Sequence, residues 1–156
     1  MGTQTVVHSF ASTDGSSPQG VAEDHAGSLY VVAAGGGTNG WGTLLKVSKD
    51  GTSASTLYNF CSLANCADGA QPSGRVQIDK SGNVYGVTTQ ANGNVGAGGV
   101  VWEVNTSGQE TVLHTFGSNT APGAGLTIDS AGNLYGVTFN GGAAHLGTVF
   151  KLTLVK

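Results

Sequence analysis

The sequence predicts an all-β protein made of three copies of one unit of about 50 residues. One observation is a tyrosine-centred segment that recurs at Tyr30, Tyr85 and Tyr135, with spacings of 55 and 50 residues. An aspartate stands six residues before each tyrosine, and 27 glycines divide the chain into short apolar segments. No segment shows a helical period of 3.6 over a stretch long enough to form a helix. The fold class predicted is therefore all-β.

Each unit contains four short segments that are rich in β-branched and aromatic residues and bounded by turn-forming residues, which is the pattern of β-strands. The first strand follows Pro18, Pro72 or Pro122 and ends at an aspartate, and the second carries the tyrosine. The tight turn between them contains glycine and an Asx residue. The third strands are predicted near residues 42–46, 99–103 and 147–151, and the fourth at 56–60, 112–116 and, before the first unit, 5–10.

The order of these strands along the chain is offset. The chain is a single repeat domain with units at 11–60, 61–116 and 117–154, preceded by the strand at 5–10 and ending on a third-type strand at 148–154, twelve strands in total. In closed β-propellers such an offset lets the N-terminal strand complete the last blade. Three blades are fewer than the four to eight that close a ring, so we expect half of a six-bladed propeller, completed by a second chain as a homodimer. A head-to-tail contact that did not close would give a fibre. The alternative is a β-trefoil, which also has three repeats and twelve strands.

Composition excludes some partners and favours a location. Charged residues make up 10% of the chain with no basic stripe, so no nucleic-acid partner is expected. No stretch has the ~20 apolar residues of a membrane span, and a strand pattern rather than a signal peptide follows Met1. Cys61 and Cys66 are close enough in the chain for a loop disulfide. Together these features favour an extracellular or cell-surface bacterial protein.

Long loops provide the candidate binding residues. In a propeller, the connections at 11–20, 61–74 and 117–125 share one face with those at 33–41, 89–98 and 139–146. Trp41 lies in a glycine-rich loop without an aromatic counterpart in the other units, so it could stack on a sugar ring or simply anchor its loop. The candidate ligand-binding residues are Asn39, Trp41, Asn92, Asn94, Asn140 and His145.

The motif from Asp129 to Thr138, followed by Gly147 to Leu152, and the segment Val112 to Phe116 resemble the GloVer tandem repeat of bacterial exported proteins. The third unit is most similar, and the first departs at Ser28 and Val31. Residues 18–22 also resemble blades of the NHL type. These resemblances imply a propeller-like β fold and carry no established activity.

Catalytic and metal-binding patterns are absent from the sequence. There is no nucleophile elbow, no zinc-protease helix motif and no phosphate-binding loop, and the glutamates are too scattered to nominate a carboxylate pair. The recurring aspartates could suggest a calcium site, but their place before a turn favours capping. His8 and His114 share one strand position, which favours a structural role. We expect no catalytic residue, metal or cofactor.

The function expected is that of a non-enzymatic module that self-assembles by strand exchange and displays loops for a ligand such as carbohydrate. Its partners would be a second copy of itself and a glycan or surface polymer. One alternative is a purely structural protein of the cell surface. Another is a six-bladed hydrolase or lactonase, which would require a central metal with Glu and Asn ligands.

Overall fold

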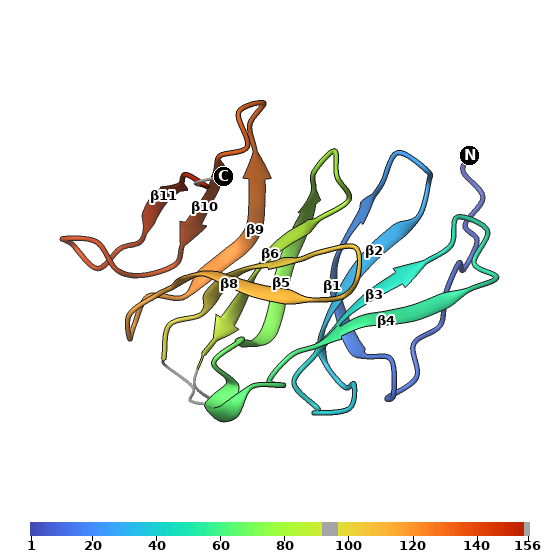
Figure 1. The fold of residues 1–156 in the computed structure, drawn as a ribbon, viewed down its shortest axis with the longest axis horizontal. Helices are drawn as coiled ribbons and strands as arrows, with labels where there is room; N and C mark the ends of the chain where they lie inside the picture. Colours follow the sequence, from blue (N-terminus) through green and yellow to red (C-terminus); the bar gives the residue numbers. More distant parts are fainter. Residues whose placement is uncertain (92–96, 155–156) are drawn as a thin grey trace.

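The computed structural model describes residues 1–91 and 97–154, and these are all-β apart from one 3₁₀ turn, η1 (Ala64–Cys66). Eleven strands form three antiparallel meanders that lie side by side (Figure 1). The first meander is β1 (Ser16–Glu23), β2 (Leu29–Gly35), β3 (Thr43–Val47) and β4 (Ala54–Asn59). The second is β5 (Ala70–Ile78), β6 (Val84–Gln90), β7 (Val100–Val104) and β8 (Glu110–Thr115). The third is β9 (Pro122–Ile128), β10 (Leu134–Thr138) and β11 (Thr148–Leu152).

The meanders are arranged into two sheets. The first meander forms a four-stranded sheet in the order β1-β2-β3-β4, and the other two form a seven-stranded sheet in the order β11-β10-β9-β5-β6-β7-β8. Every strand pair is antiparallel except β5 with β9, which meet at one parallel bridge between Arg75 and Gly125. The seven-stranded sheet is therefore two meanders joined through their first strands.

Glycine allows these first strands to approach closely. A Cβ atom added at Gly20 would collide with the backbone of Gly74, and one added at Gly74 would collide with that of Gly125. Gly74 and Gly125 also have positive φ angles of 69° and 89°, which residues with a Cβ rarely adopt. The contact between neighbouring meanders thus depends on glycine in their first strands.

The recurring aspartate stabilises the turn between the first and second strands. Asp79 Oδ1 accepts hydrogen bonds from the backbone N–H groups of Ser81 and Asn83, and Oδ2 accepts from the Asn83 amide and the Tyr85 hydroxyl. The third meander repeats this network around Asp129, where hydrogen bonds from Asn133 lower the pKa of the carboxyl to about 2. This geometry accounts for the constant spacing between aspartate and tyrosine without a bound ion.

The apolar core lies between successive meanders in two clusters. The first contains Tyr30, Val32 and Leu44 of the first meander, with Val84 and Trp102 of the second. The second cluster contains apolar residues of the second meander, Tyr85, Val87 and Val101, together with residues of the third, Leu126, Leu134 and Phe150. An aromatic residue at the end of the fourth strand joins each cluster, because the ring centroids of Phe60 and Trp102 lie 5.2 Å apart and those of Phe116 and Phe150 lie 5.1 Å apart. The first and second meanders therefore each bury side chains against the meander that follows.

Three strand assignments made from the sequence differ from the structure. The segment at residues 5–10 lies outside both sheets, so the described residues form eleven strands rather than twelve. A β-strand requires a hydrogen-bonded neighbour, and none of the described strands is paired with that segment. The last strand ends at Leu152, two residues before the predicted end. The first strands also begin earlier than predicted, at Ser16, Ala70 and Pro122. The pairing register shifts beside Pro18 in β1 and beside Ser73 in β5, and such irregularities let a strand include prolines and glycines that the sequence assigns to loops.

Membrane-spanning helices are not found among the described residues.

Candidate functional site

The loop residues predicted to bind a ligand are distributed over different meanders. Asn39 and Trp41 lie between β2 and β3, whereas Asn140 and His145 lie between β10 and β11. Asn92 and Asn94 are outside the described residues. The structure therefore does not bring the described candidates together at one site.

Trp41 lies at the boundary between the first and second meanders. Its side chain is half-buried, and its carbonyl oxygen accepts a hydrogen bond of 2.9 Å from the N–H of Gln71, the second residue of β5. The next residue, Gly42, lies so close to Pro72 that an added Cβ would collide with the proline ring. These backbone contacts hold the loop that carries Trp41 against the next meander.

The two described asparagines connect loops within the fold. Asn39 donates hydrogen bonds from Nδ2 to the carbonyl oxygen of Phe60 and to Ser62 Oγ, each at 3.1 Å. Asn140 Oδ1 accepts a hydrogen bond of 3.0 Å from the N–H of Ala121. His145 is exposed, as Asn39 is, and its backbone has a positive φ of 57°.

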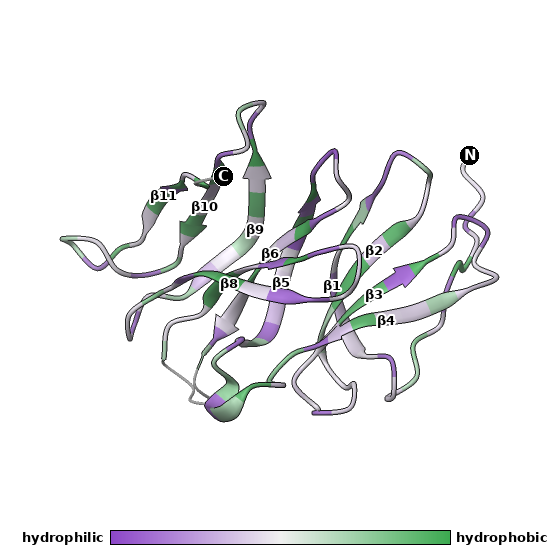
Figure 2. Ribbon diagram, viewed as in Figure 1, coloured by the Kyte–Doolittle hydropathy of each residue, from purple (hydrophilic) through white to green (hydrophobic). Residues whose placement is uncertain are grey.

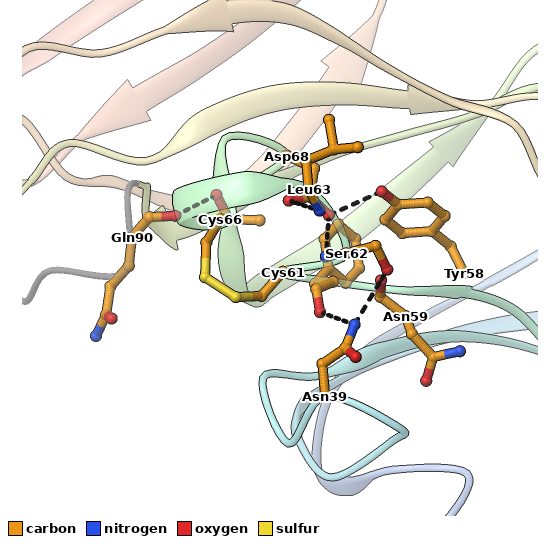
Figure 3. The surroundings of a disulfide bond; sticks show 11 residues. Asn39, Tyr58, Asn59, Cys61, Ser62, Leu63, Cys66, Asp68 and Gln90 are labelled. Atoms are coloured by element: carbon orange, nitrogen blue, oxygen red, sulfur yellow. Dashed lines mark hydrogen bonds between the residues drawn. A yellow bond between two sulfur atoms is a disulfide. The ribbon is translucent and has the colours of Figure 1, made fainter.

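A disulfide and a buried aspartate shape the connection from β4 to β5 (Figure 3). Cys61 and Cys66 are bonded, with their Cα atoms 4.0 Å apart around η1. Asp68 is fully buried and accepts hydrogen bonds from the N–H groups of Ser62 and Leu63 and from the Tyr58 hydroxyl. The sequence signal for this network is an aromatic or histidine residue followed by an aspartate, which occurs at His8 and Asp14 and again at Tyr58 and Asp68.

A second carboxyl lies close to Asp68. Glu110, the first residue of β8, is half-buried, and burial together with the negative charge of Asp68 raises its pKa to about 7. Its Oε1 atom is buried without a hydrogen-bond partner. Within the described ranges, no three His, Cys, Asp or Glu side chains lie close enough to hold a metal ion. Asp68 and Glu110 are therefore two neighbouring carboxyl groups at the junction of the first two meanders.

The largest difference between the meanders is in the exposure of their apolar residues. One cross-strand pair recurs at the same position in each meander, namely Val32 with Leu44, Val87 with Val101, and Val137 with Val149, and in the first two meanders this pair packs against the meander that follows. The first two pairs are 0% exposed, whereas Val137 is 39% and Val149 is 82% exposed. Phe139 and Leu146 are exposed beside them, and Figure 2 shows the apolar character of β10 and β11 at this end of the molecule. We name Val137, Phe139, Leu146 and Val149 the open face.

Comparison with known proteins identifies the repeat. Residues 1–156 match the family described as the Gloeobacter/Verrucomicrobia repeat. The chain belongs to this family. The match confirms the GloVer resemblance indicated by the sequence. A search of curated proteins found no match to the chain.

The open end of this Gloeobacter/Verrucomicrobia repeat chain also has an unpaired strand edge. In the first two meanders the third strand pairs on both sides, β3 with β2 and β4, and β7 with β6 and β8. Among the described residues, β11 pairs with β10 alone. The backbone groups on the other edge of β11 are therefore available to another strand.

The opposite end of the repeat chain carries the segment of residues 5–10, which we name the N-terminal segment. Its Val6 side chain is 69% exposed, and His8 Nε2 lies 3.0 Å from Asp14 Oδ2. The described chain thus has an unpaired strand edge at β11 and, at its other end, a segment outside both sheets.

Proposed function

We propose that the chain is a non-enzymatic module of three β-propeller blades, which associates with a second copy of itself into a six-bladed ring and displays its loops for binding. The main observation in support of this proposal is the exposure of the open face. Val137 and Val149 are exposed where the equivalent pairs of the first two meanders are fully buried. Burying one such side chain contributes about 1.5–3 kcal/mol, which favours association of this face with another meander.

The arrangement of the strands supports propeller blades. Each meander follows the chain order, and β5 and β9, the first strands of the second and third meanders, meet side by side in parallel. The core is divided into two clusters, one at each junction of meanders. Blades around a common axis have this organisation. A β-trefoil would instead gather its three units around one shared core.

The first meander of a second copy is the occupant that fits the open face. Within the chain, the pair Val87 and Val101 is covered by the following meander, which has the same repeat pattern as the first. The third meander of one copy and the first meander of another can therefore reproduce a junction that the chain already forms twice. The contact is head to tail, and two such contacts close a ring of six blades.

The oligomeric state tests this proposal. Light scattering of the purified chain should give about twice the chain mass of 15.5 kDa. Val149→Asp should give a folded monomer, because a charge would be buried in the contact. The control is Leu63→Lys, which alters an apolar residue that is 53% exposed but lies away from the open face. A wild-type chain that stays monomeric at every concentration contradicts the proposal, and mass growing beyond two copies contradicts the closed ring.

Ligand display by the loops is the second part of the proposal. Ser12, Thr13, Gly36, Gly37 and Thr38 line a hollow between the segment before β1 and the β2–β3 connection. Hydroxyl and backbone groups of this kind suit a polar ligand such as carbohydrate. Binding to a glycan array should be lost in Thr38→Trp, which fills the hollow, and kept in Thr106→Trp, which alters the β7–β8 turn. Absence of binding to all glycans would contradict the carbohydrate assignment.

The Cys61–Cys66 disulfide supports a location outside the bacterial cytoplasm, where disulfides persist. Fractionation of a producing bacterium should place the protein at the cell surface or in the medium.

A further inference from the structure

We infer that the N-terminal segment is the missing fourth strand of another copy's third meander, and that its own chain already holds it in the assembled position. It would add to the exposed edge of β11 in a fixed register without first leaving its own chain. This inference rests on the proposed association of two copies and specifies how their backbones join.

The first line of support is the position of Val7. A Cβ added at Gly108, in the β7–β8 turn, would meet the carbonyl oxygen of Leu57, which belongs to the fourth strand of the preceding meander. A Cβ added at Gly51, in the equivalent β3–β4 turn, would meet the carbonyl oxygen of Val7. The N-terminal segment therefore lies beside the first meander as β4 lies beside the second.

Side-chain contacts hold the segment in this position. His8 Nε2 lies 3.0 Å from Asp14 Oδ2, and Asp14 Oδ1 accepts a 2.8 Å hydrogen bond from the N–H of Ala11. A similar pair of contacts occurs after β4, where Asp68 Oδ2 accepts hydrogen bonds from the Tyr58 hydroxyl at 2.8 Å and from the N–H of Ser62 at 2.7 Å.

The stacking of aromatic rings also repeats. The rings of His8 and Phe10 pack edge to face with centroids 5.0 Å apart, as do those of Tyr58 and Phe60 at 5.2 Å. In addition, Thr43 Oγ1 of β3 donates a hydrogen bond to the carbonyl oxygen of Asp14. The segment thus has the local contacts of a fourth strand while lacking the sheet to which a fourth strand belongs.

The backbone of the segment is available for pairing. In the described part of the chain, residues 5–10 take part in no backbone-to-backbone hydrogen bond. The outer edge of β11 is likewise unpaired among these residues. Backbone donors and acceptors on both edges would satisfy one another if β11 of a second copy lay beside the segment.

The two complete meanders define the register. The third and fourth strands pair as Leu44 with Tyr58 and Lys46 with Ser55 in the first meander. They pair as Val101 with His114 and Glu103 with Thr111 in the second, with a backbone irregularity at the same place in both. If the third meander has the same register, Val149 is paired with His8 of the other copy. Phe150 is then paired with its Val6, and Lys151 with its Thr5. The pairing covers the exposed side chain of Val6 and completes the third meander with four strands.

Cysteine cross-linking between copies tests this register. Both native cysteines are bonded to each other, so a chain with Thr5→Cys can be mixed with a chain carrying Lys151→Cys and oxidised mildly. A disulfide-linked dimer on a non-reducing gel is the expected result. Thr3→Cys, two residues out of register, is the matched control and should link with Lys151→Cys at least tenfold less.

Prior positioning of the segment is tested by Asp14→Ala, which removes its two side-chain contacts. The dimer dissociation constant should rise about tenfold, corresponding to about 1.4 kcal/mol, while the folded monomer keeps its stability. Asp50→Ala, an exposed aspartate in the β3–β4 turn, should leave the dissociation constant unchanged.

The outcomes separate this inference from the proposed function. A dimer by light scattering that fails to cross-link at Thr5 and Lys151, or that links equally well from Thr3, overturns the strand register while the proposed association stands. A dissociation constant unaffected by Asp14→Ala overturns the prior positioning. A wild-type chain that is monomeric overturns both the inference and the proposal on which it rests.

Discussion

The second and third meanders share one sequence pattern but differ in how much of it is buried. Val101 in β7 and Val149 in β11 occupy equivalent positions, yet the first is 0% and the second 82% exposed. β7 pairs with strands on both sides, whereas β11 has one neighbour in the described chain. The same residue type at the same repeat position therefore contributes to the folding of the chain in one meander and is available for association in the other.

The largest effect is expected from placing a charge at Val101, and the same substitution at Val149 is the matched comparison. Val101→Asp should destabilise the chain by more than about 4 kcal/mol or prevent folding, because an unpaired carboxylate would be buried in the second core cluster. Val149→Asp should change the free energy of unfolding of the monomer by less than about 0.5 kcal/mol. Urea unfolding followed by circular dichroism measures both. Equal losses of stability would mean that the exposure of Val149 in the single chain does not describe the folded protein in solution.

The junctions between first strands should be the next most sensitive feature. Gly74→Ala would both collide with Gly125 and impose a positive φ on a residue with a Cβ, so we expect a loss of about 3 kcal/mol. Gly132→Ala is the matched control, since Gly132 has a φ of 86° but open space around it. It should cost about 1 kcal/mol, the backbone contribution alone. If the two variants lose the same stability, close packing between β5 and β9 contributes nothing.

The disulfide distinguishes the connection from β4 to β5 from the connection between β8 and β9, which contains no cysteine. Replacing Cys61 and Cys66 by serine should reduce the free energy of unfolding by about 2 kcal/mol, because the bridge closes a short loop. Thermal unfolding of the oxidised, reduced and serine forms measures this. The mass by light scattering should not change, since the bridge lies away from the open face. Loss of the dimer would show that this connection contributes to assembly.

The sequence predicted the repeats and the turns well, and the isolated loop residues less well. The constant spacing of Asp79 and Tyr85 arises from one hydrogen-bond network, so a local pattern was sufficient to find it. Trp41 and Asn39 could not be assigned in this way, because their contacts with Gln71 and Phe60 come from residues distant in the chain. The strand predicted at residues 5–10 is absent from the described chain, because none of its described strands pairs with this segment. Local propensity favours an extended segment there, whereas a β-strand also requires a hydrogen-bonded neighbour.

The smallest effect expected concerns Glu110, whose equivalent in the first meander is Ala54, since Glu110 pairs with Val104 as Ala54 pairs with Val47. Burial and the charge of Asp68 raise the pKa of Glu110 to about 7, above the model-peptide value of 4.5. Because the folded chain holds this proton more tightly than the unfolded chain, stability falls as the pH rises from about 4.5 to about 7.

Glu110→Gln removes this ionisation, so the variant should be more stable than the wild type by about 1 kcal/mol above pH 7, a value reduced for partial exposure to solvent. The difference should vanish below about pH 4.5, where the carboxyl is protonated in both states. Gln109→Glu, which adds a carboxyl at the neighbouring exposed position, is the control and should show no such pH dependence. Urea unfolding at pH 4, 6 and 8 measures these differences. A constant difference between Glu110→Gln and the wild type across this range would mean that the carboxyl ionises in the folded chain as it does in water, and that the junction of the first two meanders does not bury its charge.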